Sequence, residues 1–210
     1  MPVPVGREEL SREVRERHQR DRVLDAATAV FAKRGYLGAT VDHIIASAGI
    51  GVGSFYQLFD GKEDCFQQAY DRVVSDARER LRKEVPADGT PATQVCMGLR
   101  LLVDMLRADP LRTRLALAEV QAAGPNAVAR HQENLDEAIP SLLGCRRESR
   151  FGDELPASLE HAIVGGVAWL LHHRLVTGDL GRDDLFPELA GIVLGPYFGE
   201  AEAARLAGAC

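Results

Sequence analysis

Segment 35–62 holds most of the residues whose types and spacing indicate a chemical task. It reads GYLGATVDHIIASAGIGVGSFYQLFDGK, with two short stretches of apolar pattern on either side of Gly49-Ile50-Gly51. Two helices joined by a tight glycine-containing turn are typical of DNA binding, where the second helix enters the major groove. Glycine and serine at 51, 53 and 54 would let that helix begin close to DNA, where its free N–H groups favour a phosphate.

The elements that must position this segment follow from apolar spacing and from stop signals. We expect a first helix from Ser11, as N-cap, to Arg34, ended by Gly35. Thr40 should cap a helix over 41–48, followed by helices over 52–59 and 62–85. Beyond a Pro/Gly loop at 86–91, helices are predicted over 92–107, 111–122, 126–143, 156–177 and 183–199.

This pattern predicts an all-α fold with two domains. Residues 11–64 would form a three-helix DNA-binding domain, and residues 65–210 a helical ligand-binding and dimerisation domain joined to it by a long helix. The length of 210 residues gives enough core for both.

Composition constrains the class of protein. Hydrophobic residues make up 46% and charged residues 27%, as in ordinary globular domains. Apolar runs stay below the ~18 residues of a membrane helix, and the N-terminus lacks a signal-peptide pattern, so we expect a cytoplasmic protein. The net charge is −6, and residues 1–64 alone carry −1, so DNA binding would depend on individually placed groups.

The wider pattern closely resembles the TetR family of transcriptional regulators over residues 20–70. The shared landmarks are Arg22 to Ala27, Phe31, Gly35, Thr40-Val41, Ala48-Gly49-Ile50, Phe55-Tyr56, Phe59 and Lys62-Glu63-Asp64. The resemblance implies phosphate contacts from Thr40, Tyr56 and Lys62. It also implies contacts in the groove from Val52, Gly53, Ser54 and Gln57, and the position of Asp42 can reach a base. Gly51, at the start of the same helix, is expected to lie beside the DNA because of its small size. Gly51 stands where many members have a Ser or Thr cap.

Each of these residues has a structural alternative. Tyr56 could simply pack, Lys62 could be a surface lysine, and Gln57 could be solvated, although it is the one amide on its helix able to read adenine. Asp42 could serve only as a helix N-terminal charge. The stretch from Arg7 to Arg22, interleaved with Glu, could be a solvated helix face or an arm that grasps DNA.

The second domain contains a stretch, 162–171, that is apolar on every helical face. Such a helix is buried on every side, which suggests a core on one side and a second subunit on the other. We expect the dimer interface to include Ile163, Val167, Leu170, Leu171, Leu189, Ile192 and Val193. A ligand pocket could be lined by Met97, Leu101, Met105, Val128, Leu135, Ile139 and Trp169, although plain core is the alternative.

Other chemistries have weaker signals. His172 and His173 are adjacent and point about 100° apart on a helix, so with His161 they make a poor metal site. Cys145 lacks a nucleophile motif, and the four cysteines have no paired spacing and should be reduced thiols. We therefore expect no metal, no cofactor and no enzymatic activity.

The sequence thus predicts a ligand-responsive transcriptional regulator, by default a repressor, that binds a palindromic DNA operator as a homodimer. Its effector would be a small apolar or amphipathic molecule. Two alternatives stay open: a small-molecule-binding helical protein that has lost DNA binding, and a helical enzyme.

Overall fold

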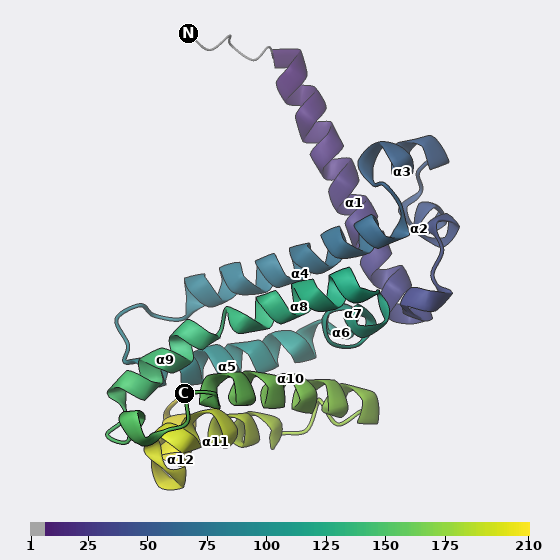
Figure 1. Cartoon of the computed structure of the whole chain (residues 1–210). Coiled ribbons are helices and arrows are strands. Elements are labelled where there is room, and N and C mark those ends of the chain that lie inside the picture. Colours follow the sequence, from purple (N-terminus) through teal and green to yellow (C-terminus); the bar gives the residue numbers. More distant parts are fainter. Residues whose placement is uncertain (1–6) are drawn as a thin grey trace.

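The computed structural model describes residues 7–210, with side chains from Val14 onward. None of the described residues lies in a strand, which confirms the predicted all-α fold. Helix α1 (Arg7–Gly38) is the longest, and its first turns project away from the other helices (Figure 1). The predicted N-cap at Ser11 is wrong because α1 runs back to Arg7. The Glu and Arg residues before Ser11 have higher helix propensity than serine.

Three short connections place the next helices at one end of the molecule. Helix α1 bends at Gly35, whose φ of 73° is in the region that favours glycine, and the final turn then leads to α2 (Val41–Ala48). Helix α3 (Val52–Leu58) follows, and α4 (Lys62–Glu84) crosses the molecule (Figure 1). These four helices lie within a few residues of the ranges predicted from the sequence.

The remaining helices form the larger part of the molecule. After α5 (Pro91–Ala108), the chain forms α6 (Pro110–Arg114), one π-helical turn η1 (Leu115–Glu119) and α7 (Val120–Ala122) without leaving the helical path. The last elements are α8 (Pro125–Asp136), α9 (Ile139–Glu148), η2 (Gly152–Glu154), α10 (Leu159–Thr177), α11 (Leu185–Phe198) and α12 (Glu200–Ala209).

Three features of this part differ from the sequence prediction. The single helix expected over 126–143 is two helices, because Pro140 has no N–H to continue the ladder and its ring excludes the carbonyl four residues earlier. The helix over 111–122 contains a π turn. Helix α12 was not predicted; it begins after Gly199, where φ is 84°.

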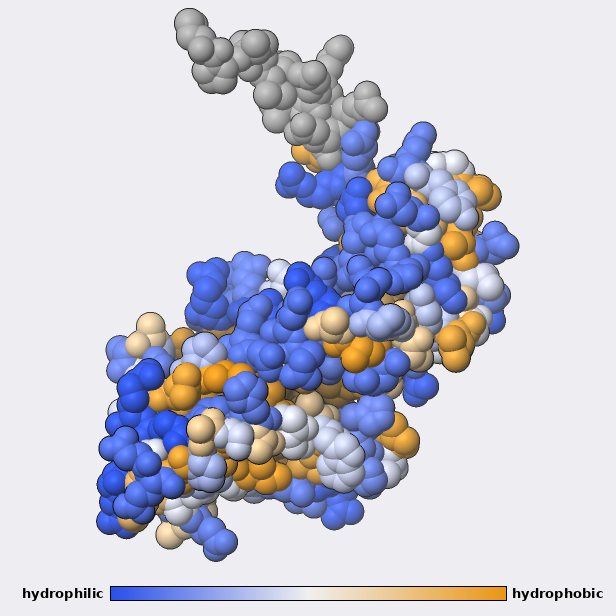
Figure 2. Space-filling view, in the orientation of Figure 1, coloured by the Kyte–Doolittle hydropathy of each residue, from blue (hydrophilic) through white to orange (hydrophobic). Residues whose placement is uncertain are grey.

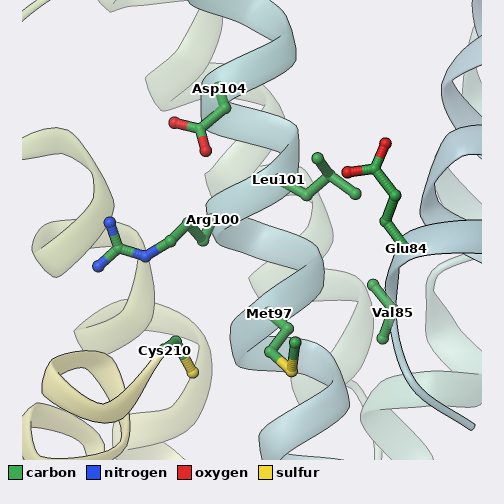
Figure 3. Close-up of a pocket in the computed structure, with 7 residues that line it drawn as sticks. All are labelled: Glu84, Val85, Met97, Arg100, Leu101, Asp104 and Cys210. Atoms are coloured by element: carbon green, nitrogen blue, oxygen red, sulfur yellow. The ribbon is translucent and has the colours of Figure 1, made fainter.

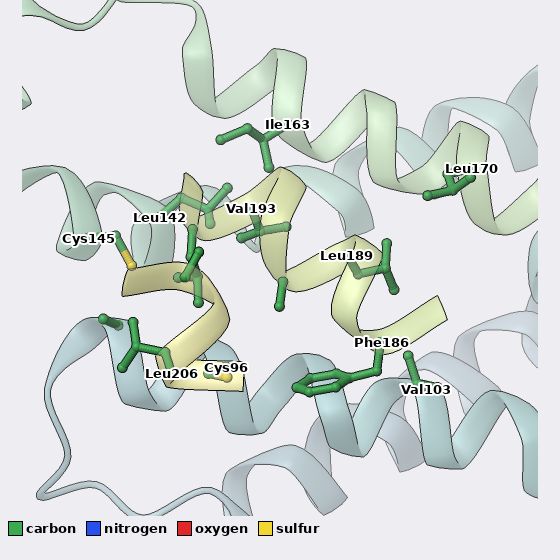
Figure 4. Packing of buried hydrophobic residues seen from close by; sticks show 14 of the residues in the cluster. Cys96, Val103, Leu142, Cys145, Ile163, Leu170, Phe186, Leu189, Val193 and Leu206 are labelled. Atoms are coloured by element: carbon green, nitrogen blue, oxygen red, sulfur yellow. The ribbon is translucent and has the colours of Figure 1, made fainter. Parts of the chain in front are cut away.

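Two hydrophobic cores hold the helices together. The first joins α1–α4 to residues from η1, α7 and α8, including the fully buried Leu115 and Val120. The second lies among α5, α9, α10, α11 and α12, and Figure 4 shows Phe186, Leu189 and Val193 of α11 in it. Because Leu115 and Val120 complete the first core, the segment after α6 packs directly on the N-terminal helices.

Helix α8 lies along α4 and contacts it largely through polar side chains. We call this contact the α4–α8 seam. Its pairs are Glu63–Asn126 at 3.1 Å, Tyr70–His131 at 2.8 Å, Asp71–Arg130 at 3.0 Å and Arg78–Glu137 at 2.9 Å. In Figure 2 this face is mainly hydrophilic, whereas more hydrophobic surface gathers below it, toward α10 and α11. Among residues 7–210, no helix has the length and apolar composition to span a membrane.

Candidate DNA-binding interface

The start of α2 is fixed by reciprocal caps. The His43 N–H donates to Thr40 Oγ1, and the Thr40 N–H donates to His43 Nδ1, both at 3.2 Å. This capping box usually has Glu or Gln in the position of His43, so the sequence predicts Thr40 as a cap but does not indicate His43 as its partner. Thr40 and Asp42 are both exposed at this helix start.

The turn between α2 and α3 is held from α1. Gly49 takes the left-handed conformation with φ of 64°, and the Ile50 N–H donates to the Ile45 carbonyl at 3.3 Å. Arg22 of α1 donates to the carbonyl oxygen of Ala48 at 3.0 Å. Arg22 therefore caps the end of α2, a positioning role that the sequence analysis did not identify.

Helix α3 has one buried face and one exposed face. Phe55 is fully buried and, together with Phe59 just after the helix, attaches α3 to the first core. The opposite face has four exposed positions at helical spacing: Val52, Gly53, Tyr56 and Gln57. Gly51 is also exposed and provides no side-chain cap, as expected from its lack of a hydroxyl, and Ser54 is half-buried.

Lys62 links α4 to the end of α1. Its Nζ donates to the carbonyl oxygens of Tyr36 at 3.0 Å and Ala39 at 3.2 Å, and it lies 4.3 Å from the centre of the Tyr36 ring. Burial raises the pKa of the Tyr36 hydroxyl, with a smaller contribution from the charge of Glu63. The Lys62 ammonium is therefore both close to α2 and held in place by the protein.

Other cations of this unit make internal contacts. Arg72 of α4 forms an ion pair with Asp25 at 3.0 Å, and the Arg20 guanidinium lies 5.4 Å from the centre of the Phe59 ring. These contacts of Arg72 and Arg20 hold α1 against α4 and against the residue that follows α3.

The residues predicted to form a dimer interface divide into two groups. Ile163, Leu170, Leu171, Leu189 and Val193 are buried in the protomer's own core, so they cannot contact a second subunit without leaving it. Val167 is half-buried and Ile192 is 39% exposed. Different residues form the exposed side of α10 and α11. Trp169 is 65% exposed there and Val176 is 68% exposed. The glycines at 165, 166 and 191 are exposed as well.

The residues predicted to line a pocket are not gathered in one cavity. A small cavity of about 150 Å³ lies where the end of α4, α5 and Cys210 meet, and it includes Met97 and Leu101 from the predicted set (Figure 3). Its rim carries Glu84, Arg100 and Asp104. The other predicted residues, Met105, Val128, Leu135, Ile139 and Trp169, lie outside it.

The histidines and cysteines considered for other chemistry have structural surroundings. His172 Nδ1 donates to the Leu117 carbonyl at 2.8 Å, and the His173 ring stacks on Trp169 with centres 5.1 Å apart. Burial raises the pKa of Cys145 to about 12, which keeps it a thiol. Within the part of the chain that the structure describes, no group of three His, Cys, Asp or Glu side chains is arranged to hold a metal ion.

Comparison with known proteins agrees with this geometry. Residues 23–69 match the family model described as bacterial regulatory proteins, tetR family. The transcriptional repressor AcnR of Corynebacterium diphtheriae is 29% identical over 188 residues, which cover 85% of this chain and 88% of AcnR. The repressor KstR of Mycolicibacterium smegmatis is 26% identical over 114 residues, 52% of this chain and 56% of KstR.

Solved structures share the fold along most of the chain. The fatty acid degradation regulator FadR from Bacillus halodurans superposes with a TM-score of 0.72 at 19% identity, covering 85% of this chain and 94% of FadR. FadR from Bacillus subtilis, solved in complex with stearoyl-CoA, gives a TM-score of 0.68 at 18% identity, covering 85% and 97%. The similarity therefore extends from the helix-turn-helix unit through the larger helical part.

Proposed function

Because this chain belongs to the TetR family of DNA-binding transcriptional regulators, we propose that it is a ligand-responsive repressor that binds a palindromic operator as a homodimer in the cytoplasm. Residues 11–64 would bind DNA, and residues 65–210 would bind the effector and dimerise. Relatives named as repressors, including AcnR and KstR, support repression.

The exposed face of α3 is the observation that carries this proposal. Val52, Gly53, Tyr56 and Gln57 form one surface on a helix whose other side is anchored by Phe55. A firmly held short helix whose exposed face carries an amide and a hydroxyl suits contacts in the major groove. Phosphate contacts would come from Thr40, Tyr56 and Lys62, and further groove contacts from Asp42, Gly51 and Ser54.

A second copy of this chain would cover the exposed face of α10 and α11. Trp169, Val176 and Ile192 are apolar there, and Gly165 and Gly166 allow close helix approach. A two-fold dimer would present two α3 helices to one side of DNA, at roughly 34–36 Å, one helical turn. We therefore replace the buried residues of the predicted interface by this exposed set, keeping Val167 and Ile192.

The effector would be a small apolar or amphipathic molecule bound in the larger helical part. The cavity beside Met97 and Leu101, at about 150 Å³, is smaller than the roughly 300–1,000 Å³ usual for ligand sites. Binding at this cavity would therefore require it to widen. The stearoyl-CoA complex of the B. subtilis relative makes a long-chain acyl-CoA the first probe to test.

The test uses full-length protein and a duplex selected from a random pool by the wild type. We expect tight binding of the selected duplex, and Gln57→Ala should reduce the preference over unrelated duplexes by about 5- to 150-fold, as for loss of one bidentate base contact of about 1–3 kcal/mol. Gln121→Ala, another exposed glutamine on α7, is the matched control and should bind as wild type. Failure to select any duplex would contradict the DNA-binding role.

Ligand response is measured on the same duplex. Stearoyl-CoA and a set of unrelated apolar compounds are screened by thermal shift, because a ligand of the folded state raises the melting temperature. A compound that binds should change operator affinity by about 5- to 150-fold. If compounds bind tightly and operator affinity stays constant, the ligand-responsive part of the proposal fails while DNA binding stands.

A further inference from the structure

A buried carboxylate joins the two parts of the molecule. Glu119, the last residue of η1, is 6% exposed. Its Oε2 accepts the backbone N–H of Tyr36 at 2.8 Å, and its Oε1 accepts Arg114 Nε at 3.1 Å. A buried carboxylate is costly unless such partners compensate its lost hydration. One of these partners belongs to the N-terminal helices, 83 residues away in sequence.

The amide that Glu119 holds lies at a sensitive point of the chain. Tyr36 directly follows the bend at Gly35, and Glu119 Oε2 is 3.4 Å from where a Cβ at Gly35 would lie. Thr40, the N-cap of α2, follows four residues later. Lys62 holds the carbonyls of this link and Glu119 holds its N–H, so together they fix the path by which the chain enters α2.

The turn that carries Glu119 also contacts α10. The Leu117 carbonyl of η1 accepts a hydrogen bond from His172 Nδ1 at 2.8 Å. His172 lies on the helix that carries Trp169 and its exposed face. A π turn contains one residue more than an α turn, and such turns are frequent at functional sites. If the turn relaxed to α-helical geometry, Glu119 would rotate by about 100°, the angle of one helical residue.

We propose that Glu119 is a positioning residue that couples α10 to the DNA-binding helices. While η1 keeps its π geometry, the carboxylate holds Tyr36 and presents α2 and α3 in one orientation. A shift of α10, acting through His172 and the Leu117 carbonyl, changes the geometry of η1 and withdraws Glu119. The coupling to effector rests on the proposed function, but the contact of Glu119 with Tyr36 can be tested without effector or DNA.

The first experiment compares Glu119→Ala with Glu119→Gln in the full-length protein. Amide hydrogen exchange at Tyr36 and over 37–44 is measured by NMR, together with affinity for the duplex selected by the wild type. Glu119→Ala removes the acceptor, so we expect Tyr36 exchange to accelerate at least tenfold and the dissociation constant to rise about tenfold, because the link must then be ordered on binding. Glu119→Gln keeps an acceptor oxygen, so it should retain most of the Tyr36 protection and most of the affinity for the duplex.

Two controls separate this role from a general loss of stability. Arg114→Ala removes the other partner of Glu119 and should leave Tyr36 protection in place. Asp183→Ala changes an exposed carboxylate on the connection between α10 and α11. Circular dichroism melts identify a variant that fails to fold. If Glu119→Ala does not fold, the exchange rate of Tyr36 in Glu119→Gln decides the test. Wild-type exchange at Tyr36 in a folded Glu119→Ala protein would overturn the proposal.

The second experiment tests the path from α10. His172→Ala removes the donor to Leu117, and His161→Ala, an exposed histidine on the same helix, is the matched control. We expect faster exchange over 115–119 and at Tyr36 in His172→Ala alone. If the effect stays within 115–119 and Tyr36 keeps its protection, the coupling is refuted. The exchange rates over 115–119 and at Tyr36 are both measured without DNA. If the wild type had no affinity for any operator, that finding would count against the proposed function. It would not affect the conclusion drawn from the exchange rates.

Discussion

The ammonium of Lys62 donates to the carbonyl oxygen of Tyr36 at 3.0 Å and sits 4.3 Å from the centre of the same residue's ring. A second N–H bond goes to Ala39. An ammonium has three donors, so one remains for a DNA phosphate. Lys62 can therefore hold the link between α1 and α2 and contact DNA from that fixed position.

Replacing Lys62 by alanine should have two separable effects. The melting temperature should fall, because hydrogen bonds from a charged group contribute about 1.5–3 kcal/mol. The slope of log affinity against log salt should shrink by about one unit, as expected for loss of one phosphate contact. Lys83→Ala, an exposed lysine at the far end of α4, should change neither. If the slope of log affinity against log salt is unchanged, Lys62 does not contact a DNA phosphate and only stabilises the link between α1 and α2.

Tyr56→Phe should weaken DNA binding without affecting the fold. The side chain is 56% exposed on α3, so removing its hydroxyl should leave the melting temperature unchanged. Loss of a hydrogen bond to a charged phosphate, about 1.5–3 kcal/mol, would reduce affinity about tenfold or more. The reduction should be equal for selected and unrelated duplexes, because phosphates carry no sequence information. A loss confined to the selected duplex would instead indicate base contact by Tyr56.

Local signals predicted the N-terminal helices well. Thr40, Gly49 and the break at Asp60-Gly61 set the bounds of α2, α3 and α4 through caps and turns, which involve neighbours in sequence. The π turn and the contact of Glu119 with Tyr36 gave no local signal. They arise because the segment after α6 packs on α1, and no residue near Glu119 in sequence indicates that partner.

The proposed dimer surface shows a different limit of the sequence. The stretch 162–171 of helix α10 is apolar on every face, so composition indicates burial on all sides but does not say which face meets the protomer's own core. The sequence predicts that Trp169, which has the largest apolar side chain there, lines a pocket, whereas its side chain is 65% exposed. The packing of α11 against α10 determines which face of α10 is buried in the protomer and which face is exposed.

Substitutions on the two faces of α10 and α11 should therefore behave differently. Trp169→Glu and Ile192→Glu place a charge on the exposed face, so they should yield folded monomers by sedimentation while the wild type is a dimer at micromolar concentration. Leu171→Arg places a charge in the protomer's core, where an unpaired buried charge costs several kcal/mol, and should unfold the chain. A dimeric Trp169→Glu protein would contradict the proposed interface.

Acid should weaken the larger helical part of the molecule through Glu160. Hydrogen bonds from Arg146 hold the pKa of this carboxyl below its ordinary value of 4.5, and the Tyr197 hydroxyl donates to it at 3.0 Å. Because the folded-state pKa is the lower one, this stabilisation is fully present above about pH 4.5 and is lost as pH falls through the folded-state pKa.

Glu160→Gln should therefore flatten the dependence of melting temperature on pH in the acid range. Near neutral pH the variant should already be less stable, because it lacks the charge that pairs with Arg146. Glu154→Gln, an exposed carboxyl on η2, is the matched control. Parallel pH profiles for Glu160→Gln and wild type would show that another group governs acid sensitivity.

The α4–α8 seam has a thermodynamic consequence. Its ion pairs, such as Asp71–Arg130, are exposed, so they can exchange protein partners for water without uncovering apolar surface. Heat capacity changes follow apolar exposure, so breaking these pairs should carry almost none. The strength of these pairs should therefore shift little with temperature and respond instead to ionic strength, which screens exposed pairs over about 8 Å under physiological conditions.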